Sequence, residues 1–331
     1  MKIAIVKLSA LGDIVHAMVV LQFVKKINQE ISIDWIVEDR YKDLLEFHPD
    51  INKVHSICLK QAKEEKSILV LIREFKKINK LPTYDLVIDM QGLLKSAIIS
   101  RIIPSKLILG FDKTSLREGL ASIFYNKTFN YGYAENIIER NFELIKFAFE
   151  LPINKEEINH KQPFLFFDKQ YETSVLSKIK KNVILIPGAS HISKRYPAAN
   201  FSKLVNLLDA NYLVIWGDLE EKKIAEKIKS LSPDVSICNR MTLSSLISLV
   251  SRVDLVIGPD TGPTHIAWGL NIPSITLFGP TPGYRNTYLT KINKIIESNS
   301  KVNTYKIDKT DYSIRNIDAK DISHIAKSLL L

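Results

Sequence analysis

Short apolar runs rich in β-branched residues alternate along the chain with longer stretches in which apolar residues recur every third or fourth position. The short runs are typical of buried strands and the longer stretches of amphipathic helices, so their alternation predicts βα units that build parallel sheets. The first half of the chain predicts strands at 2–8, 33–37, 54–58, 86–90 and 107–111. The second half repeats the pattern, with predicted strands at 183–186, 212–216, 235–238, 255–257 and 274–278.

Helical patterns separate these strands and cover 14–27, 68–78, 134–151, 201–208, 220–231, 243–250 and 319–331. A chain of 331 residues is long enough for two domains. We therefore predict an α/β protein in which two Rossmann-like domains face each other across a cleft. The predicted parts are a first domain at 1–152, a polar linker at 153–163, a second domain at 164–317 and a C-terminal helix at 318–331 that can pack back on the first domain.

The composition is that of a globular protein, with 46% hydrophobic and 25% charged residues. No run approaches the roughly 18 apolar residues of a membrane-spanning helix, and the apolar N-terminus reaches Lys7 too soon for a signal peptide. Cys58 and Cys238 both lie in apolar runs, which predicts two buried thiols in a reducing compartment. These features together predict a cytoplasmic protein that can contact a membrane at its surface.

The net charge of +10 indicates an anionic partner, such as a phosphate group, an anionic lipid or a nucleic acid. Lysine is abundant everywhere in this chain, so only local clusters are informative. Between Lys60 and Lys80 there are seven cations and three glutamates, which form either an anion-binding surface or a solvated helix face. The aromatic residues are scattered through apolar runs instead of alternating with basic ones, which argues against nucleic acid as the partner.

Ligands of doubly wound sheets bind beyond the carboxyl ends of the strands, so the loops after the strands carry the candidate chemistry. The loop at 9–13 follows the first predicted strand and contains one glycine, Gly12. Tight binding of NAD or FAD here is disfavoured, because a dinucleotide fingerprint needs three glycines at fixed spacing. Asp13 opens the next helix and is either a helix cap or a catalytic base.

The loop at 186–197 follows the first predicted strand of the second domain. Ala189 and Ser190 are small enough for a ligand to approach the backbone, and Lys194 and Arg195 place two cations in the same loop. This combination suits a phosphate group. The alternative is an exposed loop with solvated cations.

The loop at 258–265 follows another predicted strand and precedes a helix-like stretch at 266–270. Its glycines, prolines and threonines can present backbone N–H groups and hydroxyls to an anion, which predicts a pyrophosphate site. Asp260 and His265 lack a third ligand at suitable spacing, so no metal site is predicted. His265 is alternatively a histidine that is satisfied at the start of the helix.

Two of these segments, SALGDIVH at 9–16 and DTGPTH at 260–265, resemble the bacterial heptosyltransferases of glycosyltransferase family 9. Three others, at 34–38, 89–96 and 115–126, are similar to the family member that adds the first heptose to Kdo. The resemblance extends from Met1 to about residue 280. It implies a GT-B fold with the acceptor on the first domain and the donor on the second.

The resemblance also implies roles for individual residues. Asp13 matches a general base, and Lys194 matches a lysine that reaches the donor phosphates. Glu221 matches a residue at the ribose, and Met241 matches a residue at the adenine. The implied donor-binding set is Ala189, Ser190, Lys194, Glu221, Met241, Asp260, Thr261, Gly262, Pro263 and His265. The implied acceptor-binding set is Gly12, Lys60, Lys63, Lys95 and Arg117.

The implied reaction is the inverting transfer of L-glycero-D-manno-heptose from ADP-heptose to the Kdo of Kdo-lipid A, without a cofactor or a metal. The expected location is the cytoplasmic face of the inner membrane, in peripheral contact with its anionic surface. Such a displacement needs a base for the acceptor hydroxyl and positive groups for the leaving diphosphate, and the three loops supply both. The alternatives are transfer of the second heptose, or a nucleotide-sugar epimerase or hydrolase on the same scaffold.

Overall fold

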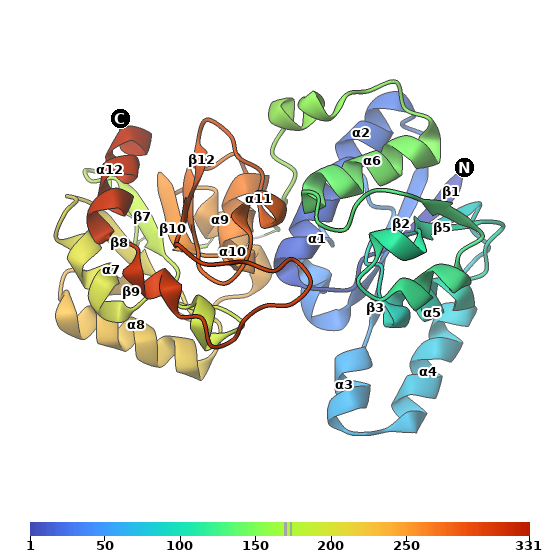
Figure 1. The fold of residues 1–331 in the computed structure, drawn as a ribbon, viewed down its shortest axis with the longest axis horizontal. Coiled ribbons are helices and arrows are strands. Elements are labelled where there is room, and N and C mark those ends of the chain that lie inside the picture. Colours follow the sequence, from blue (N-terminus) through green and yellow to red (C-terminus); the bar gives the residue numbers. More distant parts are fainter. Residues whose placement is uncertain (169–170, 173) are drawn as a thin grey trace. The chain divides into compact units, whose positions relative to one another are not determined.

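The computed structural model describes residues 1–168, 171–172 and 174–331 (Figure 1). The chain divides into two compact units, Met1–Phe164 and Leu165–Leu331, and each unit is described by itself. The stretch at 153–163, predicted as a linker, lies within the first unit. It contains a short 3₁₀ helix, Lys155–His160, which buries Ile158.

The first unit is built on a parallel six-stranded sheet with the order β3-β2-β1-β4-β5-β6. Its strands are β1 (Lys2–Val6), β2 (Ser32–Glu38), β3 (Lys53–Ile57), β4 (Leu86–Asp89), β5 (Ile108–Phe111) and β6 (Lys127–Phe129). The five predicted strands are confirmed, with ends that differ by one or two residues. Strand β6 was not predicted, because its three residues are mostly exposed and form no apolar run.

The helices of the first unit are α1 (Leu11–Met18), α2 (Val20–Ile27), α3 (Leu59–Glu64), α4 (Ile68–Asn79), α5 (Leu94–Ile102) and α6 (Ile137–Phe149). The prediction of one helix at 14–27 is wrong in one respect, because the structure has two helices there, α1 and α2, which meet at Val19. Val19 keeps helical dihedral angles, with φ −55° and ψ −27°, so the interruption affects the hydrogen-bond ladder and not the backbone conformation. Phe23 of α2 meets Phe142 of α6 edge to face, with ring centroids 5.1 Å apart.

The second unit has a parallel six-stranded sheet with the order β12-β11-β10-β7-β8-β9. Its strands are β7 (Asn182–Leu185), β8 (Asn211–Val214), β9 (Ser236–Ile237), β10 (Leu255–Pro259), β11 (Ser274–Phe278) and β12 (Asn293–Glu297). Strand β12 was not predicted, because its lysine and half-buried residues weaken the apolar signal. Counted within its own unit, each sheet has the strand order of a doubly wound fold, which confirms the predicted α/β class with two Rossmann-like domains.

The helices of the second unit are α7 (Ala198–Val205), α8 (Leu219–Leu231), α9 (Leu243–Val250), α10 (Gly262–Gly269), α11 (Gly283–Asn286) and α12 (Ala319–Leu330). Packing of the C-terminal helix on the first domain was an option at the sequence level, but the structure corrects it. Ile322 and Ala326 of α12 are fully buried in the core of the second unit, together with residues of β10 and β11. Among the described residues, no helix combines the length and the hydropathy needed to cross a bilayer.

The two thiols differ in burial. Cys238 is buried, as predicted, and burial raises its pKa to about 11. Cys58 is only half-buried, which corrects the prediction, because it follows β3 as the cap residue of α3 at the edge of the unit.

Candidate active site

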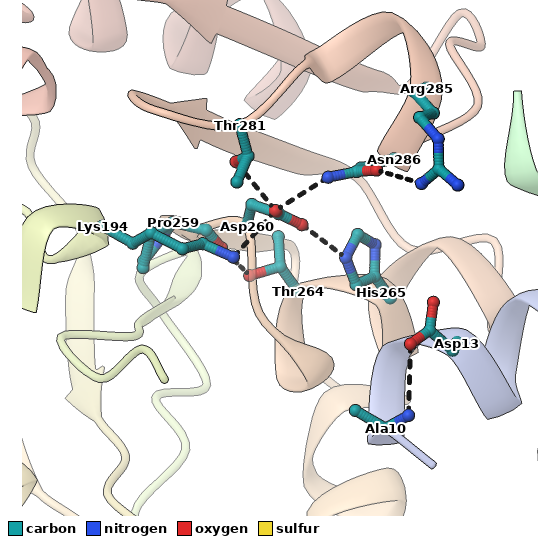
Figure 2. Close-up of polar contacts among 10 residues, drawn as sticks. All are labelled: Ala10, Asp13, Lys194, Pro259, Asp260, Thr264, His265, Thr281, Arg285 and Asn286. Carbon is teal, nitrogen blue, oxygen red and sulfur yellow. Dashed lines mark hydrogen bonds and ion pairs between the residues drawn. The ribbon is translucent and has the colours of Figure 1, made fainter. Parts of the chain in front are cut away.

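The loop between β1 and α1 carries Asp13, the third residue of α1. The Oδ2 atom of this half-buried side chain accepts the backbone N–H of Ala10 at 3.1 Å, and Figure 2 shows its other oxygen pointing away from that contact. The capping contact is therefore present. It occupies one carboxylate oxygen and is compatible with a catalytic role for the other.

The segment after β4 holds this loop in place. The Oε1 atom of Gln91 accepts the N–H groups of Leu8 and Ser9, each at 3.1 Å, and the Lys95 ammonium lies 3.4 Å from the Ser9 hydroxyl. Strands β1 and β4 are neighbours in the sheet, so their carboxyl ends bring the two segments together. Gln91 was not predicted as a site residue, although it lies in a segment that carries the resemblance.

Asp89, at the end of β4, fixes the backbone around Gln91. Its buried carboxylate accepts the N–H groups of Gln91 and Gly92 at 2.8 and 3.0 Å and the hydroxyl of Tyr125 at 2.8 Å. Burial raises the pKa of Asp89, while these hydrogen bonds favour its ionised form. The buried Asp89 thus fixes Gln91, and Gln91 in turn fixes the start of the loop that carries Asp13.

Lys95, a predicted acceptor cation, lies close to this loop, and a second one, Arg117, lies near the segment of Lys95. Lys95 and Arg117 are both exposed, and Glu118 links their segments because it accepts the Leu94 N–H at 2.9 Å and lies 3.6 Å from the Arg117 guanidinium. The structure therefore brings Lys95 and Arg117 into one region.

The other two predicted cations, Lys60 and Lys63, are exposed on α3. The Glu38 carboxylate, at the end of β2, accepts the Lys60 N–H at 2.5 Å and so anchors the start of this helix. Burial raises the pKa of Glu38, and the Lys60 N–H and the Lys95 ammonium oppose that shift. Glu38 thus lies within electrostatic reach of both groups of cations, a role that the sequence pattern did not predict.

Asp260, directly after β10, is the centre of the polar network in the second unit (Figure 2). Its carboxylate contacts Lys194 Nζ at 2.8 Å, Thr281 Oγ1 at 2.9 Å, His265 Nε2 at 3.1 Å and Asn286 Nδ2 at 3.3 Å. Burial alone would raise the pKa of Asp260, but Lys194 and His265 hold it far below its usual range. The carboxylate is therefore charged and tightly held.

Two members of this network, Thr281 and Asn286, were missed at the sequence level. They lie after β11, where the segment 279–283 is rich in glycine and proline. That composition marks a loop at the carboxyl end of a strand, the same signal that identified the other site loops.

The N-terminus of α10 lies beside Asp260. Thr261 is the cap residue, Gly262 and Pro263 open the helix, and all three are half-buried. Thr264 donates its hydroxyl to the Pro259 carbonyl at 2.8 Å, which ties the first turn to β10. Backbone N–H groups in the first turn of a helix lack intrahelical acceptors and attract anions. The helix begins four residues before the stretch predicted at 266–270.

Glu221, in the first turn of α8, joins the loops after β7 and β8. Its Oε2 accepts the Gly217 N–H at 2.7 Å, and a Cβ added to Gly188 would lie 2.1 Å from its Oε1. A side chain at position 188 would displace the Glu221 carboxylate, which lies directly against the backbone of the loop that leads to Lys194.

The remaining predicted donor residues differ in exposure. Ala189 is buried, and its carbonyl accepts the Arg195 Nε–H at 3.3 Å. Ser190 is exposed, and Met241 is half-buried just before α9. In the described part of the chain, no group of three or more His, Cys, Asp or Glu side chains is arranged to hold a metal ion.

The chain is similar to known proteins along most of its length. Residues 72–313 match the family described as "Glycosyltransferase family 9 (heptosyltransferase)". The chain is 39% identical to lipopolysaccharide heptosyltransferase 1 of Campylobacter coli over 99% of both chains, and 26% identical to its Escherichia coli K12 counterpart over 87% and 91% of the two chains. The solved structure of the Escherichia coli heptosyltransferase WaaC with ADP has a TM-score of 0.81 at 22% identity, covering 99% of this chain and 100% of that one, which supports a shared fold.

Proposed function

Since the chain belongs to glycosyltransferase family 9, the heptosyltransferases, we propose that it transfers heptose from ADP-heptose to the Kdo of Kdo-lipid A in synthesis of the lipopolysaccharide inner core. The observation that carries this proposal is the similarity to a heptosyltransferase 1 along 99% of both chains, since it includes the loops of both units. The test is mass spectrometry of Kdo-lipid A incubated with ADP-heptose and the purified protein. The expected product is heavier by one heptose residue.

In the proposed reaction, Asp13 is the general base. It takes the proton from the acceptor hydroxyl as the hydroxyl oxygen bonds to the anomeric carbon of heptose, while the bond from that carbon to the diphosphate breaks and ADP leaves. A single displacement of this kind inverts the anomeric centre and needs no covalent intermediate on the protein. The fixed Ala10 N–H contact keeps the base in one orientation during proton transfer.

The diphosphate of the donor would be held by Lys194 and the N-terminus of α10. The ammonium of Lys194 gives one hydrogen bond to Asp260, which orients the group and leaves its other two N–H bonds for phosphate oxygens. The half-buried backbone at Thr261, Gly262 and Pro263 adds the positive end of the helix dipole. We assign Glu221 to the ribose, because its carboxylate lies at the joined loops after β7 and β8, and Met241 to the adenine.

The acceptor is strongly anionic, because Kdo carries a carboxylate and lipid A carries phosphates. Lys95 contacts the loop that carries Asp13, Arg117 lies near the segment of Lys95, and both would bind the acceptor near the reacting hydroxyl. Lys60 and Lys63 on α3 would contact its more distant charges. The same cations would favour contact with an anionic membrane surface.

We expect ADP to bind more tightly than UDP, by roughly tenfold or more. The reason is that Met241 and the loops joined by Glu221 are assigned to the adenosine moiety, whereas the diphosphate contacts are common to both nucleotides. Isothermal titration calorimetry with each nucleotide measures the difference. Equal affinities would contradict the assignment of this unit to an adenine nucleotide.

We expect Lys194→Gln and Arg117→Gln to affect different substrates. Loss of a charge-assisted contact to a phosphate or carboxylate costs about 1.5–3 kcal/mol, so Lys194→Gln should raise the KM for ADP-heptose and Arg117→Gln that for Kdo-lipid A. Glutamine at position 194 keeps a donor toward Asp260, which limits any loss of folding. Steady-state kinetics with each substrate varied separates the two effects, and equal changes in both KM values for both variants would refute the division.

A further inference from the structure

Helices α3 and α4 form a hairpin that extends from the carboxyl end of β3, away from the sheet of the first unit (Figure 1). Its far end and the outer side of α4 expose three large aliphatic side chains, Ile68, Leu69 and Ile72, which are 63%, 75% and 42% accessible. Aliphatic side chains that are exposed together and surrounded by charge mark an interaction surface. We call these three residues and the cations described next the hairpin surface.

The same hairpin carries six cations, namely Lys63, Lys66, Arg73, Lys76, Lys77 and Lys80. Within the described part of the chain, Lys63, Lys66, Lys76 and Lys80 form no salt bridge. Leu69 and Ile72 also line, with Arg73, Lys76, Lys77 and Lys80, an open groove of about 610 Å³. The hairpin surface thus combines an apolar end with six cations, of which Arg73 and Lys77 are paired with Glu74 and the other four form no salt bridge among the described residues.

The inner side of α4 is fixed by different contacts. Glu74 is buried, accepts the Cys58 N–H at 3.3 Å and lies 3.3 Å from Arg73 and 4.0 Å from Lys77, and Ile78 is also buried. Ile68, Leu69 and Ile72 take no part in these contacts, which hold the hairpin in place. The exposed aliphatic residues are therefore not required to complete the core.

We propose that the hairpin surface docks on an anionic lipid bilayer, with Ile68, Leu69 and Ile72 entering the boundary of the acyl chains and the lysines contacting lipid phosphates. The pattern of apolar residues beside lysines is that of a helix that lies on a membrane. A second copy of the chain fits less well, because a symmetric contact would bring two sets of uncompensated lysines together. The inference rests on the proposed function, since the acceptor lipid resides in a bilayer.

The test is co-sedimentation of the full chain with vesicles of phosphatidylcholine alone or mixed with phosphatidylglycerol. We expect binding to the mixed vesicles, part of which persists at high salt. We expect Ile68→Ser and Leu69→Ser each to weaken this binding by roughly tenfold, because burying such a side chain is worth about one to two powers of ten in affinity. The matched control is Ile179→Ser, since Ile179 is 97% exposed beside Lys180 and Lys181 in the second unit and should not matter.

The proposal is overturned if the serine variants bind as the wild type does, if Ile179→Ser weakens binding equally, or if high salt releases the wild type completely. It is also overturned if sedimentation velocity shows a dimer that Leu69→Ser abolishes. Circular dichroism confirms that each variant is folded. A separate assay distinguishes failure of membrane docking from failure of the proposed function. It measures transfer of heptose to a deacylated, water-soluble Kdo acceptor, which needs no membrane. The rate should be equal in the wild type and the serine variants.

Discussion

Asp13→Asn is expected to lower turnover by roughly 10²–10⁴-fold, the usual contribution of a positioned general base. The amide oxygen of asparagine can still accept the Ala10 N–H and so keep the contact at the start of α1, but asparagine cannot take a proton from the acceptor. The melting temperature and the affinity for ADP should therefore stay close to those of the wild type. The measurements are steady-state turnover, thermal unfolding and calorimetry on the same preparation.

The matched control is Asp318→Asn, in the second unit. Asp318 is the exposed cap residue of α12 and accepts the Lys320 N–H at 3.0 Å, so the same substitution removes a carboxylate charge at a helix start without affecting catalysis. We expect it to leave turnover unchanged. Full turnover in Asp13→Asn would show that Asp13 only stabilises the start of α1 and that another group is the base.

The second large effect is expected for Asp260→Ala, which should destabilise the second unit by about 3–5 kcal/mol. Lys194 is 11% exposed at its side chain, and removing the carboxylate leaves its ammonium largely buried without its counter-ion. Affinity for ADP should fall as well, because Lys194 and His265 lose their common anchor. Chemical denaturation of the full chain, followed by a probe in the second unit, measures the loss of stability.

A double variant isolates the ion pair. In Asp260→Ala with Lys194→Met, no charge is left buried, so the total loss should be smaller than the sum of the two single losses. Asp209→Ala is the control, since its pair with Lys180 is solvent-exposed and screened and should contribute little. Additive losses would show that Asp260 and Lys194 do not act as a pair.

Because the pKa of Asp260 is low, the stability that its carboxylate gives to the second unit depends on pH. Because the pKa is lower in the folded than in the unfolded state, the stabilisation is fully present above the ordinary aspartate value of about 3.9 and is lost as the pH falls below it. The difference in stability between the wild type and Asp260→Ala should therefore shrink in acid.

The sequence was most informative where a single segment determines the structure. A buried strand such as β11 is recognisable from its own apolar run, whatever strands lie beside it. Both ends of β11 were predicted without error. The three site loops were found for a related reason, since each follows such a strand. The strands β6 and β12 were missed because most of their residues are exposed or half-buried and form no apolar run.

Residues that act through contacts distant in sequence could not be found in this way. Gln91 reaches Leu8 and Ser9 across 83 and 82 positions, and Glu38 reaches Lys60 across 22. Their roles depend on which strands are neighbours in the sheet, and no local pattern records that. Thr281 and Asn286 belong to the same class, because only the fold brings them to Asp260.

The burial of α12 in the second unit has a consequence for synthesis of the chain. The first unit consists of consecutive residues that end at Phe164, so all its strands are available while the second unit is still being translated. The core of the second unit, in contrast, includes Ile322 and Ala326, and it stays open beside β10 and β11 until α12 has left the ribosome. The two halves should therefore fold in order, and a nascent chain that stalls before α12 would expose apolar surface to chaperones.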